Sequence, residues 1–134
     1  MTLQQEDRSA LITLRLARAK ETMEEFKANM QLGYWRISAN RLYYACYYAA
    51  SALLIKNNLS AHTHAGVINQ TGLHFVKKGI ISKEQGKFFK RLFELRQSGD
   101  YDDWFDIEED DVKPFIEPAE QFIATIENIL TIEN

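Results

Sequence analysis

The chain has 134 residues, of which 46% are apolar and 26% are charged, and its formal net charge is −3. This length favours one globular domain, residues 1–134, that folds without disulfides or bound metal. The lone Cys46 excludes an internal disulfide, the polar N-terminus has no signal-peptide core, and no stretch approaches the ~20 apolar residues that span a bilayer. We therefore expect a cytoplasmic protein without a membrane segment.

The first half of the sequence predicts two long helices. Apolar residues recur every three or four positions over about residues 5–31, and Gly33 is expected to end this helix. A second helix is expected from about Trp35 to Asn57. It is apolar nearly all round, which is typical of a helix at the centre of a bundle or in an interface. Core or dimer packing and base stacking are both open interpretations of its four tyrosines, Tyr43, Tyr44, Tyr47 and Tyr48.

Two shorter helices are expected next. After a polar loop near residues 57–60, a third helix runs from about His64 to Lys78 and ends at Gly79. Ser82 is a suitable N-cap for a fourth helix over about residues 83–98. An acidic loop, residues 99–106, follows it.

The last helix carries a continuous three-four apolar pattern but contains Pro114 and Pro118. It begins either near Glu108 with a kink or later with Pro118 in its first turn, and we favour the kinked helix. No segment shows the alternation of a strand. The fold class is therefore all-α, an up-and-down bundle of four or five helices.

Charge is distributed unevenly along the second half of the chain. Residues 77–98 contain seven basic side chains and two acids, whereas residues 100–120 contain ten acids and one lysine. This asymmetry suggests a charged contact with a partner or between two copies of the chain. A solvated helix face is the favoured interpretation of Lys83, Lys87, Lys90 and Arg91. Because the neighbouring acids would repel nucleic acid, a dimer or partner contact is favoured over RNA binding as their functional interpretation.

Three segments, residues 40–50, 63–79 and 92–102, are similar in order and spacing to small prokaryotic HEPN proteins. The resemblance covers about residues 35–130. It implies a helical bundle that forms a homodimer and is often encoded beside a minimal nucleotidyltransferase, as a substrate-binding partner or in a toxin–antitoxin pair. Many HEPN proteins are metal-independent ribonucleases that use an arginine followed four to six residues later by histidine, at the dimer interface.

The chain departs from that catalytic pattern. Arg96 occupies the arginine position, but residues 97–103 contain no histidine. Cleavage through a ribose hydroxyl needs groups that accept and return a proton near neutral pH, a task that suits histidine. The sequence therefore predicts no catalytic residue and no imidazole beside Arg96. A variant ribonuclease that uses Arg96 with Tyr101 or Asp100 is the alternative.

The first candidate site consists of Arg96, Asp100 and Tyr101. Arg96 could grip a phosphate while Tyr101 stacks on a base, or Arg96 could simply pair with Asp100 one helical turn away. Arg41 and Tyr44 are further candidates for phosphate and base contacts. His64 is expected to cap a helix or form a structural hydrogen bond, and neither the three histidines nor any other motif predicts a metal or cofactor.

Our leading hypothesis is a non-catalytic HEPN-type binding module. It would be a homodimer that partners a minimal nucleotidyltransferase and presents a nucleotide or RNA to it. The alternatives are the variant ribonuclease and a structural homo-oligomer that has no ligand.

Overall fold

The computed structural model describes residues 4–132, which contain helices and no strand. The long helices are α1 (Gln5–Leu32), α2 (Trp35–Lys56), α4 (Lys83–Tyr101) and α6 (Ile116–Ile132). The shorter elements are α3 (His64–Thr71), a π-helical turn (Gly72–Val76), α5 (Glu109–Val112) and a 3-10 turn (Lys113–Phe115). The all-α prediction is confirmed.

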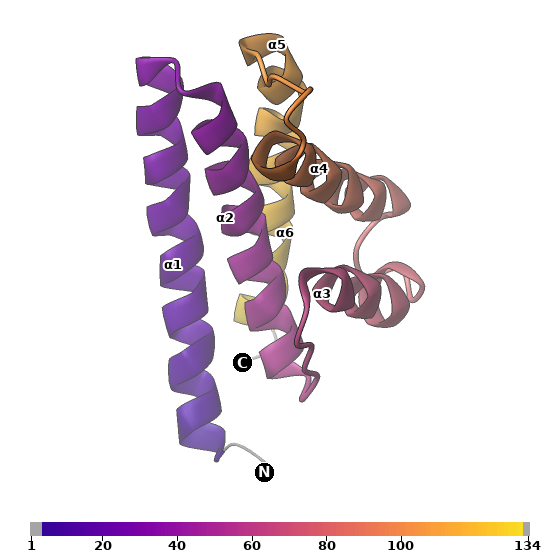
Figure 1. The fold of residues 1–134 in the computed structure, drawn as a ribbon. Coiled ribbons are helices and arrows are strands. Elements are labelled where there is room, and N and C mark those ends of the chain that lie inside the picture. The colour runs from indigo at the N-terminus through magenta and orange to yellow at the C-terminus, as the bar shows by residue number, and fades with distance from the viewer. Residues whose placement is uncertain (1–3, 133–134) are drawn as a thin grey trace.

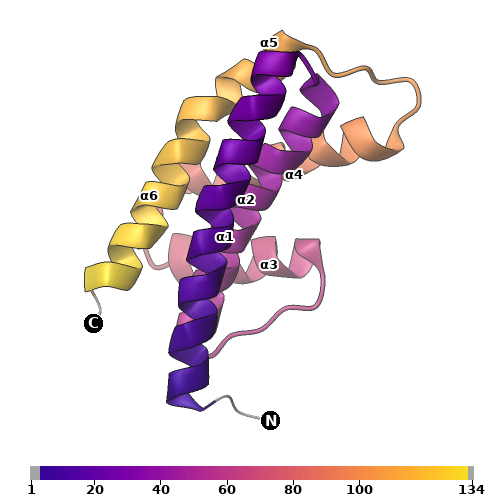
Figure 2. The same ribbon diagram turned by 90° about the vertical axis from the view of Figure 1, so that its left-hand side faces the viewer.

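The helices form an elongated bundle with two crossing members. α1 and α2 run antiparallel, and α6 lies alongside them, while α3 and α4 cross the bundle at a steep angle (Figure 1). The view from the side shows α1 and α6 on one side of α2, and α3 and α4 behind it (Figure 2). None of the helices within residues 4–132 is long and apolar enough to cross a membrane.

Helix α2 is the centre of the core. Eleven of its 22 residues are buried, and five of these are alanines, which let neighbouring helices approach closely. It packs against α1, α3, α4, α5 and α6. The prediction of a central helix that is apolar nearly all round is therefore confirmed. This buried helix also carries several of the side chains of the candidate site.

Two helix boundaries follow from local chemistry that the sequence already indicated. Gly33 ends α1 in the left-handed conformation, with φ +77°, and its N–H donates to the Met30 carbonyl at 3.1 Å. Ser82 caps α4: its Oγ accepts from the Gln85 N–H at 3.1 Å, and the Gln85 side chain accepts from the Ser82 N–H at 3.3 Å. This reciprocal pair is a capping box.

The end of α4 differs from the expected position. The helix continues through Gly99 and Asp100 to Tyr101, so the predicted loop over residues 99–106 begins three residues too early. Gly99 is buried, and a Cβ at this position would overlap the Ile107 side chain. Glycine at this position therefore allows Ile107 to pack closely against α4, and it does not form a turn. The consequence is that Asp100 lies one helical turn beyond Arg96 on a continuous helix.

The other differences are small. The third helix ends at Thr71, earlier than expected, and becomes the π-helical turn before Gly79, whose φ is +77°. The path from α5 to α6 is helical throughout, with Pro114 in the 3-10 turn and Pro118 inside α6. The structure therefore combines the two alternatives: helical structure begins just after Glu108, but α6 itself begins at Ile116 with Pro118 in its first turn.

Candidate functional site

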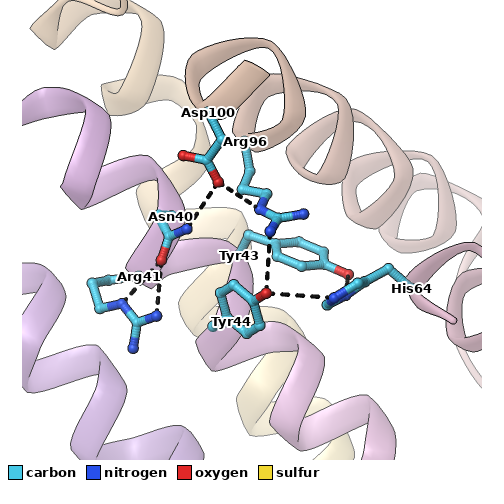
Figure 3. Close-up of polar contacts among 7 residues, drawn as sticks. All are labelled: Asn40, Arg41, Tyr43, Tyr44, His64, Arg96 and Asp100. Carbon is cyan, nitrogen blue, oxygen red and sulfur yellow. Dashed lines mark hydrogen bonds and ion pairs between the residues drawn. The ribbon is translucent and has the colours of Figure 1, made fainter. Parts of the chain in front are cut away.

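Arg96 is buried on the inner face of α4. Its side chain is 9% exposed, and its Nε lies 2.9 Å from Oδ2 of Asp100. Its Nη2 donates a hydrogen bond to the Tyr44 hydroxyl of α2 at 3.1 Å (Figure 3). The guanidinium carbon also lies 5.6 Å and 5.2 Å from the ring centroids of Tyr43 and Tyr44. The Arg96–Asp100 pair that the spacing predicted as one alternative is therefore present, and it neutralises much of the arginine charge.

His64 completes this arrangement from α3. Its Nδ1 lies 2.9 Å from the Tyr43 hydroxyl and its Nε2 lies 3.4 Å from the Tyr44 hydroxyl. Tyr44 thus connects the imidazole to the Arg96 guanidinium, as Figure 3 shows. The expectation that no imidazole lies beside Arg96 is wrong, because the histidine comes from a different helix and not from the residues that follow the arginine.

Thr63, and not His64, caps α3. The Thr63 Oγ1 accepts a hydrogen bond from the Gly66 N–H at 2.9 Å. The His64 ring instead packs among aromatic side chains, with ring centroids 4.7 Å from Tyr47 and 5.5 Å from Tyr44. The alternative of a structural hydrogen bond is therefore the one that the structure supports.

The protonation states in this cluster follow from burial and from the arginine charge. Burial, and then the neighbouring Arg96, lower the pKa of His64 below its ordinary value. Burial raises the pKa of the Tyr43 hydroxyl, although Arg96 opposes this effect. A neutral imidazole has one donor and one acceptor nitrogen, which matches two tyrosine hydroxyls. At neutral pH the cluster therefore combines a neutral His64 imidazole, the neutral Tyr43 phenol and the buried Arg96 guanidinium.

Asn40 joins a second arginine to this cluster. The Arg41 Nε and Nη2 donate to Oδ1 of Asn40 at 3.1 Å and 2.8 Å, while the Asn40 Nδ2 donates to Oδ2 of Asp100 at 3.0 Å. The Arg41 guanidinium carbon also lies 5.2 Å from the Tyr44 ring centroid. Two guanidinium groups therefore contact the same tyrosine ring. Sequence reasoning did not select Asn40, although it begins the first of the three family-like segments.

Tyr101 is the exposed member of the cluster. Its side chain is 71% exposed, and its ring centroid lies 5.7 Å from the Arg96 guanidinium carbon. The structure thus brings together five of the predicted candidates: Arg41, Tyr44, Arg96, Asp100 and Tyr101. Lys83, Lys87, Lys90 and Arg91 are exposed on α4, nearer to its N-terminus than Arg96.

One large cavity does not coincide with this cluster. It measures about 730 Å³ and is lined by residues 33–37 and 106–110, at the turn between α1 and α2. Its charged lining is mostly acidic, with Arg36 as the basic exception. In the described part of the chain, no three His, Cys, Asp or Glu side chains are grouped so that they could hold a metal ion. The candidate site therefore rests on the chemistry of the Arg96 cluster and not on cavity size.

Comparisons with known proteins identify a family and several relatives. A family model described as the HEPN domain matches residues 12–129. A UPF0332 protein of Thermotoga maritima is 40% identical over 84% of this chain and 86% of its own length. Two proteins of Methanocaldococcus jannaschii bear the name "Putative toxin"; one is 34% identical over 84% of this chain and 83% of its own length, and the other is 20% identical over 89% and 81%.

Proposed function

Because the chain belongs to the HEPN domain family, we propose that it is a non-catalytic binding module that holds a nucleotide or RNA at the Arg96 cluster. The observation that supports this proposal is the linked series Asp100–Arg96–Tyr44–His64, which fixes aromatic and basic groups from three helices around one point. A preorganised site loses little side-chain entropy when it binds a ligand.

The burial of Arg96 favours binding over catalysis. Its guanidinium is paired with Asp100 and bonded to Tyr44, so part of its charge is already neutralised and fewer of its N–H groups are free to bind a reacting phosphate. Its role in this proposal is to position Tyr44 and His64. The ligand would contact the more accessible groups beside it, with Tyr101 stacking on a base and Arg41, whose side chain is 28% exposed, near a phosphate.

A minimal nucleotidyltransferase is the partner that we propose for this module. The names of the two Methanocaldococcus relatives support a toxin–antitoxin-like pair. In that pair the HEPN chain would be a homodimer that presents the nucleotide or RNA to the transferase. Co-expression of the chain with a nucleotidyltransferase encoded next to it should give a complex that survives affinity purification. Separation of the two proteins during purification would contradict the partner assignment.

Ligand binding can be tested by the fluorescence anisotropy of a labelled short single-stranded RNA. Tyr101→Ala should weaken binding about tenfold, because one base stacked on an aromatic ring contributes about 1–3 kcal/mol. Arg41→Ala should also weaken it. Lys78→Ala changes an exposed basic residue in the turn before α4 and is the matched control. Equal RNA affinities for the unmodified protein and the three variants would contradict the proposal that this cluster is the binding site.

A ribonuclease is the second candidate, and the position of His64 favours it. The neutral imidazole could accept a proton from a ribose hydroxyl that displaces its 3.4 Å contact with the Tyr44 hydroxyl. This version has more support than one that uses Asp100 as the base, because Arg96 and Asn40 both engage the Asp100 carboxylate. RNA would be incubated separately with the unmodified protein, with the His64→Gln variant and with the Arg96→Ala variant. This experiment distinguishes a binding module from a ribonuclease. Intact RNA in all three supports the binding module, whereas cleavage that both substitutions abolish supports the enzyme.

A further inference from the structure

A small pocket lies between α1, the end of α2 and the loop that follows α2. Because α1 and α2 run antiparallel, the N-terminal half of α1 lies beside the C-terminal half of α2 (Figure 1). The pocket measures about 250 Å³, and its polar lining residues are Arg15, Tyr47, Ser51 and Ser60. The other lining residues are all apolar, so the lining contains no carboxylate.

Arg15 has no partner at this pocket. Its side chain is partly buried, and its Nε is inaccessible to solvent and forms no hydrogen bond within residues 4–132. No carboxylate of those residues forms an ion pair with it. A buried N–H group without an acceptor destabilises a folded chain, and such groups are uncommon in native proteins. The missing acceptor is therefore one that a ligand can supply.

The three hydroxyl groups of the pocket are also free to donate. Within residues 4–132, the hydroxyls of Tyr47, Ser51 and Ser60 form no hydrogen bond. Other helical hydroxyls behave differently, since Ser38 and Thr71 each donate to the carbonyl four residues earlier. Four unsatisfied donor groups therefore line one pocket.

The loop that carries Ser60 is held in place by its backbone. Asn58 has a left-handed conformation, with φ +60°, which asparagine adopts more readily than most residues. The Leu59 N–H donates to the Leu54 carbonyl at 2.9 Å, and the Asn58 N–H donates to the Ile55 carbonyl at 3.2 Å. These bonds turn the chain back at the end of α2, so the pocket is formed before any ligand arrives.

The donor set of this pocket fits a phosphate group. A guanidinium can donate two parallel hydrogen bonds to phosphate or carboxylate oxygens, and the hydroxyls add three further donors. A phosphate group offers three terminal oxygens, whereas a carboxylate has two, so phosphate satisfies more of these donors. With no acid in the lining, nothing in the pocket repels an anion.

We propose that this pocket binds a phosphate group, with the Arg15 guanidinium as its principal contact. The phosphate comes either from inorganic phosphate or from a small phosphate ester, and the experiment includes both. The pocket is separate from the Arg96 cluster, although Tyr47 borders it and also packs against the His64 ring, with centroids 4.7 Å apart. The proposal therefore does not depend on RNA binding at that cluster.

Isothermal titration calorimetry in a phosphate-free buffer tests the pocket with inorganic phosphate and with ribose 5-phosphate. At least one of them should bind saturably to the unmodified protein, with one site per chain. Arg15→Gln should weaken this binding about tenfold or more, because it removes hydrogen bonds between a charged donor and a charged acceptor. Arg18→Gln removes an exposed arginine three residues further along α1, outside the pocket, and should leave the affinity unchanged.

Acetate and ribose test the chemistry of the ligand. Acetate should bind at least about tenfold more weakly than the better phosphate compound, because it leaves more of the donors unsatisfied. Ribose lacks the anion and should not bind. Tighter binding of ribose 5-phosphate than of inorganic phosphate would identify an ester as the ligand, and the reverse order would identify free phosphate; either order supports the site.

Two further variants separate lost binding from lost folding. Ser51→Ala removes a hydroxyl that has no partner and favours the helix, so it should fold normally and bind about threefold more weakly. Arg15→Met replaces the unpaired guanidinium with an apolar side chain. Without phosphate it should be at least as resistant to urea as the unmodified protein, and saturating phosphate should raise the urea midpoint of the unmodified protein alone.

Three results would overturn the proposal: no saturable binding of either phosphate compound, an unchanged affinity in Arg15→Gln, or acetate binding as tight as phosphate binding. Tyr101→Ala keeps this proposal distinct from the RNA site. This variant is expected to bind RNA more weakly, but its affinity for the phosphate compounds should equal that of the unmodified protein.

Discussion

His64 lies at the point where α2, α3 and α4 meet, and its protonation should affect the stability of the fold. Its two ring nitrogens face the hydroxyls of Tyr43 and Tyr44, and the Tyr44 oxygen already accepts a hydrogen bond from Arg96. A protonated imidazole would need both tyrosine oxygens as acceptors and would add positive charge near a guanidinium. The folded state therefore favours the neutral ring.

This coupling predicts a pH dependence of folding. The pKa of His64 is lowered in the folded state from the ordinary value of 6.5. As the pH falls, the unfolded chain therefore binds the proton before the folded chain does. The contribution of neutral His64 to the free energy of unfolding is thus fully present above pH 6.5, and it is lost as the pH falls through the lower pKa of the folded state. Urea unfolding at about pH 7.5 and about pH 5 should show a larger loss of stability for the unmodified protein than for His64→Gln. His62→Gln, in the exposed loop, is the control, and an equal loss in His64→Gln would contradict the assignment.

Gly99 is the second residue with a specific structural requirement. A Cβ at this position would overlap the buried Ile107 side chain, so Gly99→Ala should reduce the free energy of unfolding by about 1–3 kcal/mol. Gly72→Ala is the matched control. No atom lies within 4 Å of a Cβ at Gly72 and its backbone is helical, so this change should stabilise the chain by up to about 1 kcal/mol. Urea denaturation measures both, and equal effects would show that the end of α4 is not closely packed.

The sequence indicated some of these residue contacts and not others. The Arg96–Asp100 pair could be predicted because a spacing of four residues brings the two side chains to one face of a helix. The contact between His64 and the cluster could not, because it depends on how α3 packs across α2 and α4. Local spacing carries no information on such a crossing. The family pattern, which places a histidine shortly after the arginine, therefore did not indicate His64, which precedes Arg96 in the sequence.

At the scale of the elements, periodicity located α1 and α2 to within a residue or so. Continuous three-four patterns and the Gly33 stop determine these boundaries through local backbone chemistry. The end of α4 was missed because glycine commonly terminates helices. Here its lack of a side chain serves tertiary packing against Ile107, which only the folded structure reveals.

The central position of α2 gives a strong prediction for Leu53. This side chain is fully buried, so Leu53→Asp would place an unpaired carboxylate in the core and should leave the chain unfolded. Leu14→Asp, on the exposed face of α1, should fold normally. Far-ultraviolet circular dichroism with thermal melting distinguishes the two, and a cooperative transition at the normal temperature in Leu53→Asp would contradict the assigned core.

The capping box of α4 gives a smaller effect. Ser82→Ala removes the hydroxyl that accepts from the Gln85 N–H and should reduce stability by about 1 kcal/mol. Ser9→Ala, at an exposed position in α1, should change the free energy of unfolding by less than about 0.5 kcal/mol. If the two substitutions gave the same midpoint in urea, the cap would contribute nothing measurable.

At the scale of the whole molecule, the crossing of α3 and α4 over α2 determines which side chains meet and which remain exposed. On the inner side of α4 this crossing brings Arg96 to Tyr44 and His64. On the outer side it leaves Lys83, Lys87 and Lys90 exposed. Composition and periodicity predicted helices but not this crossing angle, because many bundle arrangements bury the same apolar faces. The overall helical fold could be predicted from the family resemblance. The contacts among Arg96, Tyr44 and His64 are seen only in the structure.

The claim that a nucleotide or RNA binds at the Arg96 cluster is tested most directly by nuclear magnetic resonance. Isotope-labelled protein would be titrated with a short single-stranded RNA, and the shift of each backbone amide would be followed. We expect the largest shifts around Tyr44, His64, Arg96 and Tyr101, with an RNA that is still intact at the end of the titration. The proposed site would be contradicted if only amides on other surfaces shifted. It would also be contradicted if no amide shifted when the RNA concentration equals that of the protein.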